Sequence, residues 1–219
     1  MILCVAGEEL VCSELRALYW PRLSTLFVAD VHLGKAASLR SAALPVPFGT
    51  SEATLERLSE AVRRFSPAQL VILGDLWHAA SGRVNEEEQL FDGWLKRHVA
   101  LEVILVVGNH DRKSGPLPSR FGIDEVEMLA VGPFHLCHEP CEGDGYTLCG
   151  HIHPGVSVGA TGTRTLRLPC FWFGDRCGVL PAFGEFTGFG SISPGGGDQI
   201  IAIGDGRLHR IAPALAASR

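Results

Sequence analysis

The sequence predicts an α/β fold, and three observations support that prediction. Short, continuous apolar runs recur in the first half of the chain, as is typical of strands buried on both faces. Segments with the apolar spacing of helices lie between these runs. In the second half, apolar runs follow one another with only glycine, proline and acidic turns between them. Alternating strands and helices followed by a mainly β half favour an α/β sheet fold.

The expected elements follow in chain order. The first three strands are expected at residues 26–29, 70–73 and 103–107, and each is followed by a polar residue or glycine. Apolar positions recurring every three or four residues predict helices over residues 51–65 and 86–99, between these strands. Four more strands are expected, at residues 134–137, 146–149, 165–173 and 200–203.

Length and composition limit the classes of protein that fit. The 219 residues are ample for a core, and no repeat or linker is visible, so one domain over residues 1–219 is expected. The formal net charge of −5 indicates no general attraction to nucleic acid or to an acidic membrane. A nucleic-acid enzyme still fits, because bound divalent metals supply positive charge where a phosphate must lie.

The cysteines and the N-terminus favour a reducing, cytoplasmic environment. The seven cysteines form an odd set without a CxxC pair, so neither a disulfide framework nor a zinc knuckle is indicated. We expect most of them to be small buried apolar residues. The N-terminus carries no basic leader, and no run of about 18 apolar residues occurs. No membrane partner is therefore expected.

Asp, Asn and His follow the expected strands at the points where they end. Ligands bind beyond the carboxyl ends of strands in open α/β sheets, so these motifs together predict a metal site, although each alone is weak. Side chains two apart on an extended segment share a face, which would let both polar residues of a motif reach one cluster. The motifs are Asp30-Val31-His32, Gly74-Asp75-Leu76-Trp77-His78, Gly108-Asn109-His110-Asp111 and Gly150-His151-Ile152-His153, with His138 at the end of a further strand.

The number and type of these side chains predict two metal ions. Seven ligands are too many for one tetrahedral zinc but suit two ions that share a bridging ligand. Oxygen and imidazole ligands without thiolate suit manganese, our first expectation, and also iron or zinc. Glycines 74, 108 and 150 are expected where the backbone turns sharply or approaches a ligand closely. The expected ligands are Asp30, His32, Asp75, Asn109, His138, His151 and His153.

These motifs resemble those of the calcineurin-like metallophosphoesterases. The resemblance implies a four-layer α/β/β/α sandwich, with two sheets packed together and helices outside. It also implies a bridging Asp75, one metal held by Asp30, His32 and His153, and the other held by Asn109, His138 and His151. His138 is preferred to the nearby His135, because it falls at the end of its strand.

A closer resemblance, over nearly the whole chain, is to the ligase-associated DNA-damage-response endonucleases, the PdeM-like group of that family. It rests on motifs such as Ala29-Asp30-Val31-His32-Leu33-Gly34-Lys35 and Leu168-Pro169-Cys170-Phe171-Trp172. It implies a two-metal phosphodiesterase or endonuclease acting on DNA in repair, with single strands, flaps or ends as substrates. It further implies association with an ATP-dependent DNA ligase, a helicase and an exonuclease. The alternatives are a small-molecule or nucleotide phosphoesterase and an inactive protein-binding scaffold.

Two histidines are candidate catalytic residues. Two metal ions about 3.5–4 Å apart acidify a bridging water and draw in phosphate oxygens. His110 would stabilise charge on the phosphate or protonate the leaving alkoxide, a role worth about 10²- to 10⁴-fold in rate. By resemblance, His78 would position the phosphodiester or assist proton transfer. The alternative for both is an ordinary loop histidine, and Asp111 would either orient His110 or cap the next helix.

Four basic side chains near the motif ends are candidate substrate contacts. A solvated surface position is the alternative for each of them. The tryptophans at positions 77 and 172 could stack on a base, although buried packing is the better expectation for both. The basic candidates are Lys35, Arg40, Arg112 and Lys113.

Overall fold

The first sheet forms the centre of the molecule in the computed structural model, which describes residues 1–141, 145–159 and 165–212. Its seven strands lie in chain order, antiparallel from β1 to β4 and parallel from β4 to β7. The parallel register aligns Leu26 with Leu70 and Leu70 with Val103. The strands are β1 (Ile2–Val5), β2 (Glu8–Cys12), β3 (Leu18–Trp20), β4 (Thr25–Val28), β5 (Gln69–Leu73), β6 (Glu102–Val106) and β7 (Asp124–Val126).

Within the described residues, the second sheet has nine strands and mixed directions. Its main path runs β14-β11-β12-β13-β10-β9-β8, and β15 joins it by pairing with β12 and β16. The long β12 pairs with β11 through its first half and with β15 through its second half. The strands are β8 (Leu129–Val131), β9 (Phe134–Leu136), β10 (Tyr146–Cys149), β11 (Pro154–Val158), β12 (Leu166–Phe173), β13 (Cys177–Val179), β14 (Gly190–Ser191), β15 (Gln199–Gly204) and β16 (Arg207–Ile211).

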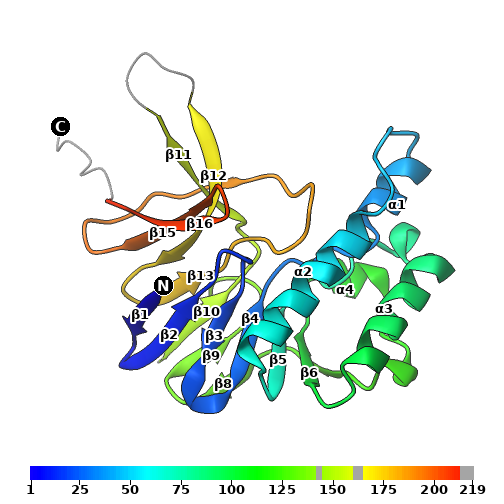
Figure 1. Ribbon diagram of the computed structural model, residues 1–219, viewed down its shortest axis with the longest axis horizontal. Coiled ribbons are helices and arrows are strands. Elements are labelled where there is room, and N and C mark those ends of the chain that lie inside the picture. The colour runs from blue at the N-terminus through cyan, green and yellow to red at the C-terminus, as the bar shows by residue number, and fades with distance from the viewer. Residues whose placement is uncertain (142–144, 160–164, 213–219) are drawn as a thin grey trace.

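The helices lie on the outer side of the first sheet (Figure 1). Apolar side chains of α2 and α3, among them Leu58 and Trp94, pack against Leu26, Leu70 and Val103 of the sheet. All α-helices of the described residues precede residue 115. They are α1 (Lys35–Ser41), α2 (Thr50–Phe65), α3 (Asn85–Arg97) and α4 (Asn109–Ser114), and short 3-10 turns occur at Pro21–Leu23, Ala80–Gly82 and Ser119–Phe121.

The main core lies between the two sheets. Side chains that alternate with the helix-facing ones, such as Phe27 and Val71, point to the other face of the first sheet. There they pack against Phe134, Leu148 and Phe171 of the second sheet. The central strands β4, β5 and β6 are thus buried on both faces, which explains why their sequences are continuous apolar runs.

The α/β class, with two packed sheets and helices outside the first of them, is confirmed, and every expected strand and helix is present. Their ends differ from expectation by at most two residues; the helix expected over residues 86–99, for example, is Asn85–Arg97. Sequence reasoning missed short elements, among them β1, β3, β13 and α4, because segments of a few residues give too few apolar positions to establish a period.

The state of the cysteines and the character of the helices can be described directly. None of the seven cysteines, all of which the structure describes, is in a disulfide. Cys12, Cys137, Cys149 and Cys170 are buried, as expected of small apolar residues. Within the described residues, no helix combines the length and the apolar character needed to span a bilayer.

Candidate metal centre

The expected ligands converge on one rim of the sandwich, beyond the carboxyl ends of strands from both sheets. Asp30 and Asp75 lie two residues after β4 and β5, and Asn109 begins α4 after β6. His138 and His151 lie two residues after β9 and β10 in the second sheet. The sandwich therefore brings together side chains as far apart in sequence as Asp30 and His153.

Asp30, His32 and His153 form one part of this rim, the His32 half. Nε2 of His153 lies 3.2 Å from Asp30 Oδ1 and 3.4 Å from Nε2 of His32. One ligand atom from each of the three residues falls within 4.8 Å of the others. The Asp30 carboxylate also accepts a hydrogen bond of 2.9 Å from the backbone amide of His151. These three side chains can share one cation.

The second part of the rim, the Asn109 half, consists of Asp75, Asn109, His138 and His151. Nε2 of His138 lies 3.0 Å from Asn109 Oδ1, 3.1 Å from His151 Nδ1 and 3.4 Å from Asp75 Oδ2. Ligand atoms of Asp30, Asp75 and His138 also fall within 4.8 Å of one another. Asp30 thus belongs to both clusters of donors, and the two halves are contiguous.

The backbone of these residues corrects one premise of the sequence analysis. We expected Asp30 with His32, and His151 with His153, on extended segments. Instead all four have positive φ, between 50° and 64°, and Asp75 has a φ of 54°. The left-handed backbone turns His151 towards the Asn109 half and His153 towards the His32 half. Such strained backbone is concentrated at functional sites in proteins, which fits a ligand-binding role.

Three glycines line the ligands and leave them room. A Cβ at Gly74 would lie 2.0 Å from Nδ1 of His138, and one at Gly108 would lie 2.2 Å from Asp75 Oδ1. A Cβ at Gly150 would lie 2.5 Å from Asp30 Oδ2. Any side chain at these positions would displace a ligand, so the expected close approach at all three glycines is present.

Burial and neighbouring charge shift the pKa values of His32 and His138 in opposite directions. Burial lowers the pKa of His32 to about 2, so its ring is neutral and offers a lone pair to a cation. Burial also acts to lower the pKa of His138, but the hydrogen bond and charge of Asp75 outweigh it and raise that pKa to about 9. Although burial opposes it, the same contact holds the pKa of Asp75 below its usual value. This set of carboxylate, amide and imidazole donors fits divalent cations.

His110 and His78 lie beside the His32 half. The His110 amide donates a 2.9 Å hydrogen bond to Asp75 Oδ1, and its ring centre lies 5.1 Å from that of His32. The rings of His78 and His110 are stacked with centres 4.9 Å apart. Burial lowers the pKa of His78 to about 4, so this ring is neutral at physiological pH. Both predicted catalytic histidines therefore border the rim.

Asp111 resolves the alternatives left open by the sequence. Its Oδ2 accepts hydrogen bonds from the amides of Asp75 (2.7 Å) and Gly108 (2.9 Å), and its Oδ1 accepts one from the amide of Trp77 (3.1 Å). The side chain caps the start of α4 and ties the loop after β5 to it. This arrangement is a helix cap, which positions two ligand-bearing loops relative to each other.

The four basic residues predicted to contact substrate lie in different surroundings. Lys35 lines a small cleft with His32. Arg40, at the last turn of α1, lies over the ring of Phe48 at 4.1 Å. Arg112 is exposed and paired with Glu127, and Lys113 is exposed on α4. Of these four, Lys35 is the one that borders the rim.

The two tryptophans are packed, as expected. Trp77 is fully buried in the core beneath the helices, and Trp172 is half-buried and donates a 2.6 Å hydrogen bond to Asp198. Neither presents an open ring face beside the ligands.

Sequence reasoning assigned no role at the site to the loop of residues 183–190, which lies against the His32 half. The amide of Gly184 donates to the Asp30 carbonyl (2.9 Å), and the amide of Gly190 donates to the His153 carbonyl (2.9 Å). The loop carries two exposed phenylalanines, Phe186 and Phe189. Exposed aromatic residues in a glycine-rich stretch are the signal that could have identified it.

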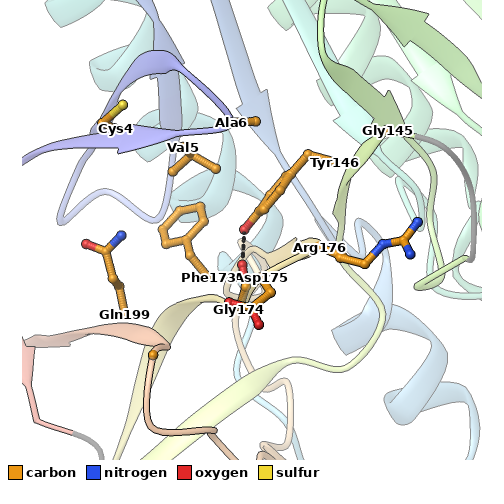
Figure 2. A pocket seen from close by; sticks show the side chains of 11 residues that line it. Cys4, Val5, Ala6, Gly145, Tyr146, Phe173, Gly174, Asp175, Arg176 and Gln199 are labelled. Carbon is orange, nitrogen blue, oxygen red and sulfur yellow. Dashed lines mark hydrogen bonds between the residues drawn. The ribbon is translucent and has the colours of Figure 1, made fainter.

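A larger cleft, of about 490 Å³, lies elsewhere, at the end of β10 opposite His151 (Figure 2). Tyr146, Phe173 and Arg176 help to line it, and the Tyr146 hydroxyl donates a 2.9 Å hydrogen bond to the Gly174 carbonyl. None of the described residues that line this cleft is an expected metal ligand. The predicted metal ligands and catalytic histidines therefore lie at the other rim, away from this cleft.

Comparison with known proteins agrees with this geometry. The sequence matches the calcineurin-like phosphoesterase family over residues 23–168, which include every expected ligand. The crystal structure of Pseudomonas putida nuclease MPE is similar, with 38% identity and a TM-score of 0.86, and the match covers 96% of this chain and 99% of that one. A phosphoesterase of E. coli, Yfce, has 16% identity and a TM-score of 0.38, with 87% and 99% covered, too distant for inference. No curated protein matches the sequence.

Proposed function

The chain belongs to the calcineurin-like phosphoesterase family, and we propose that it is a two-metal phosphodiesterase that cuts DNA. One observation carries the proposal: two contiguous clusters of carboxylate and imidazole donors, which share Asp30, lie at a single rim with His110 beside them. A single cation would not use both clusters. A binuclear centre with a neighbouring proton donor is the arrangement by which two-metal enzymes hydrolyse phosphate esters.

In this proposal, Asp30, His32 and His153 would hold one ion, and Asn109, His138 and His151 would hold the other. Asp75 would contribute its carboxylate to both. Manganese is our first expectation for both ions, with iron or zinc as alternatives. When bound, such ions act as Lewis acids that activate water and neutralise phosphate charge.

The role of His110 follows from its two ring nitrogens. Nδ1 faces the carbonyl oxygen of His78 and therefore carries a proton. The second proton of the imidazolium form is on Nε2, which lies 4.0 Å from Asp75 Oδ2 and faces the rim. From there it would pass to the leaving oxygen of the ester. His78, stacked on His110, would hold that ring in place.

Several observations favour nucleic acid as the substrate. The nuclease with 38% identity covers nearly the whole chain, and the predicted motifs resemble those of repair endonucleases. Lys35, beside His32, would contact a substrate phosphate. A role in DNA repair, in the cytoplasm and together with a DNA ligase, a helicase and an exonuclease, is the finer part of the proposal and rests on the resemblance alone.

The test compares three substrates: bis(4-nitrophenyl) phosphate, 4-nitrophenyl phosphate and labelled DNA oligonucleotides. Each is incubated with the purified protein after metal removal and again after manganese is added. We expect manganese-dependent cleavage of the diester and of the DNA, and little turnover of the monoester. Asp75→Ala should abolish this activity, and Asp124→Ala, which changes an exposed aspartate on the edge strand β7, is the matched control.

Each other outcome rejects part of the proposal. Preferred cleavage of the monoester or of nucleotides, with DNA left intact, would identify a small-molecule phosphoesterase. A folded, manganese-loaded protein that cleaves none of the substrates would indicate a binding scaffold instead.

A further inference from the structure

We propose that Cys137 and Cys141 are a redox-sensitive modification site, whose reversible disulfide bond encloses the expected ligand His138 and weakens metal binding by the Asn109 half. The site is separate from the proposed reaction, because the bond forms between two thiols and requires no phosphate ester. It is argued from the distance between the two sulfurs, from the exposure of one of them and from the position of His138 between them.

Three thiols gather on the outer face of the second sheet. Leu136 and Leu148 point into the core between the two sheets, so alternation along β9 and β10 turns Cys137 and Cys149 to the opposite face. There both pack in one small cluster, which Cys177 also contacts. Cys137 and Cys149 are each within two residues of an expected histidine ligand of the Asn109 half.

The sulfurs in this region come together in two pairs. Sγ of Cys137 lies 3.2 Å from Sγ of Cys141. Sγ of Cys149 lies 3.6 Å from Sγ of Cys177. Within the part of the chain that the structure describes, no cysteine belongs to a group of three donors whose atoms lie within 4.8 Å of one another. A thiolate metal site gathers several sulfurs around one ion, so this geometry favours a bond within a pair instead.

The backbone distinguishes the two pairs. Thr147 is level with Cys177 in the parallel pairing of β10 with β13, so Cys149 lies two residues further along its strand. Strand spacing and rise separate the Cα atoms of such a diagonal pair by about 8 Å, beyond the roughly 7 Å that a disulfide spans. Cys141 lies outside the strands, beyond a bend at residues 138–139, and is free of this constraint. The pair that can close is therefore Cys137 with Cys141.

Exposure determines where an oxidant attacks. Cys141 is exposed and Cys137 is buried, so a disulfide of a small thiol, such as glutathione disulfide, reaches Cys141 first. The Cys141 thiolate attacks one sulfur of the reagent, which forms a mixed disulfide and releases one glutathione. The Cys137 sulfur, after losing its proton, attacks Sγ of Cys141 and releases the second glutathione. Two electrons and the two thiol protons thus pass from the protein to the reagent, which becomes two molecules of glutathione.

Bond formation changes the bend that carries His138. In the reduced state the Cys137 thiol donates a 2.9 Å hydrogen bond to the Glu139 carbonyl, and oxidation removes this donor. Oxidation also brings the sulfurs from 3.2 Å to about 2 Å. The Cys137 amide donates to the Leu148 carbonyl and holds this residue in the sheet. The movement therefore falls on the bend between the two cysteines.

His138 connects this bend to the Asn109 half. Its Nε2 lies 3.0 Å from Asn109 Oδ1 and 3.4 Å from Asp75 Oδ2, and its carbonyl accepts a 3.1 Å hydrogen bond from the Gly150 amide. Changing the groups that orient a metal-binding imidazole typically weakens metal binding or activity by about 10- to 100-fold. We expect the lower end of this range, because Nδ1 still faces the Leu73 carbonyl oxygen.

The experiment equilibrates the purified full-length protein with glutathione and glutathione disulfide at a series of ratios and then removes both by gel filtration. Peptide mapping by mass spectrometry, after alkylation of the remaining thiols, should find the Cys137–Cys141 bond and no Cys149–Cys177 bond. Manganese titrated into the oxidised, metal-free protein should bind at one of its two sites about tenfold more weakly than in the reduced protein. Dithiothreitol, removed before the titration, should restore the affinity.

Two serine variants separate this bond from other effects of the oxidant. Cys141→Ser removes the exposed partner, so its manganese affinity should be that of the reduced wild-type protein both before and after treatment. Cys177→Ser is the matched control at a partly exposed thiol of the other pair. It should form the Cys137–Cys141 bond and lose affinity as the wild-type protein does.

Each contrary result has a definite meaning. Absence of the Cys137–Cys141 bond at every ratio overturns the modification site. A bond that leaves manganese affinity unchanged, or an equal loss of affinity in treated Cys141→Ser, overturns its effect on the metal centre. A protein that forms the bond and loses affinity, but cleaves no phosphodiester when reduced, would support the modification site and contradict the proposed function.

Discussion

The two halves of the candidate metal centre differ in how their imidazoles are supported. In the Asn109 half, Nδ1 of His138 lies 3.1 Å from the Leu73 carbonyl oxygen, and Nε2 faces Asp75 and Asn109. In the His32 half, Nδ1 of His32 is buried without a hydrogen-bond partner among the described residues. One half is held in place by the protein, whereas the other has an unsatisfied group.

Because of this difference, we expect the two halves to contribute unequally to the stability of the fold and to metal binding. A supported ligand contributes to folding even without a metal, since its hydrogen bonds and ion pair form within the protein. An unsupported ligand costs free energy until something binds to its ring. We therefore expect metal binding to stabilise the protein most at the His32 half, which also borders the loop of residues 183–190. Substitutions in the Asn109 half should cause the larger loss of unfolding free energy in the metal-free protein.

The largest effect should come from Asp75, the buried carboxylate of the Asn109 half. Asp75→Ala removes the carboxylate that faces His138 and accepts the His110 amide, so both ions and the proton donor lose a contact. We expect turnover of bis(4-nitrophenyl) phosphate to fall to background and bound manganese, measured by elemental analysis, to fall with it. Full turnover in this variant would eliminate the two-metal proposal.

The next largest effect should be a loss of catalytic rate without a loss of bound metal. His110→Asn removes the proposed proton donor and leaves the ligands of both halves in place, so kcat should fall by about 10²- to 10⁴-fold while manganese content stays constant. His209→Asn, at an exposed histidine of β16, is the matched control. Loss of manganese along with activity would mean that His110 is a ligand instead.

A paired substitution tests the comparison directly by measuring stability without metal. His138→Leu leaves the buried Asp75 carboxylate without its partner, which should cost about 3–5 kcal/mol of unfolding free energy. His32→Leu removes a ring nitrogen that has no partner, so the change should stay within about 1 kcal/mol. Urea denaturation of the two metal-free variants measures both values, and equal losses would contradict the asymmetry between the halves.

The smallest effect should be a pH dependence of the Asn109 half. In the metal-free protein the pKa of His138 is raised from 6.5 to about 9, so its contribution to stability is complete below pH 6.5 and is lost as the pH rises through 9. Metal binding requires the neutral ring, so manganese affinity should rise by up to about tenfold per pH unit over the same interval. Calorimetry in buffers of different ionisation enthalpy should detect release of the proton, and a pH-independent affinity would count against this ligand.

Much of the fold could be predicted because its central strands are buried on both faces. Continuous runs such as residues 70–73 and 103–107 leave little ambiguity, and their ends marked where Asp75 and Asn109 would lie. The edge strands β7 and β14 were missed, since their sequences contain no continuous apolar run. The clustering of the expected ligands was predictable from a general property of strand ends in α/β sheets.

Other features of the site depend on tertiary contacts that no local pattern encodes. The left-handed backbone of Asp30 and His153 was not foreseen, because an i, i+2 spacing indicates extended chain. Asp111 could be assigned as a cap only from the structure, in which the amides of Asp75 and Trp77 in the loop after β5 donate hydrogen bonds to its carboxylate. The unpartnered nitrogen of His32 likewise depends on which groups surround it in three dimensions.

The distribution of the ligands over both sheets has a consequence for biosynthesis. A nascent chain that has emerged through β7 already carries Asp30, His32, Asp75 and Asn109, but none of the three remaining histidines. A cation captured at that stage would meet an incomplete set of donors. The full set exists only after translation has passed His153, and a product truncated before residue 138 would lack three of the expected ligands even if its first sheet were intact.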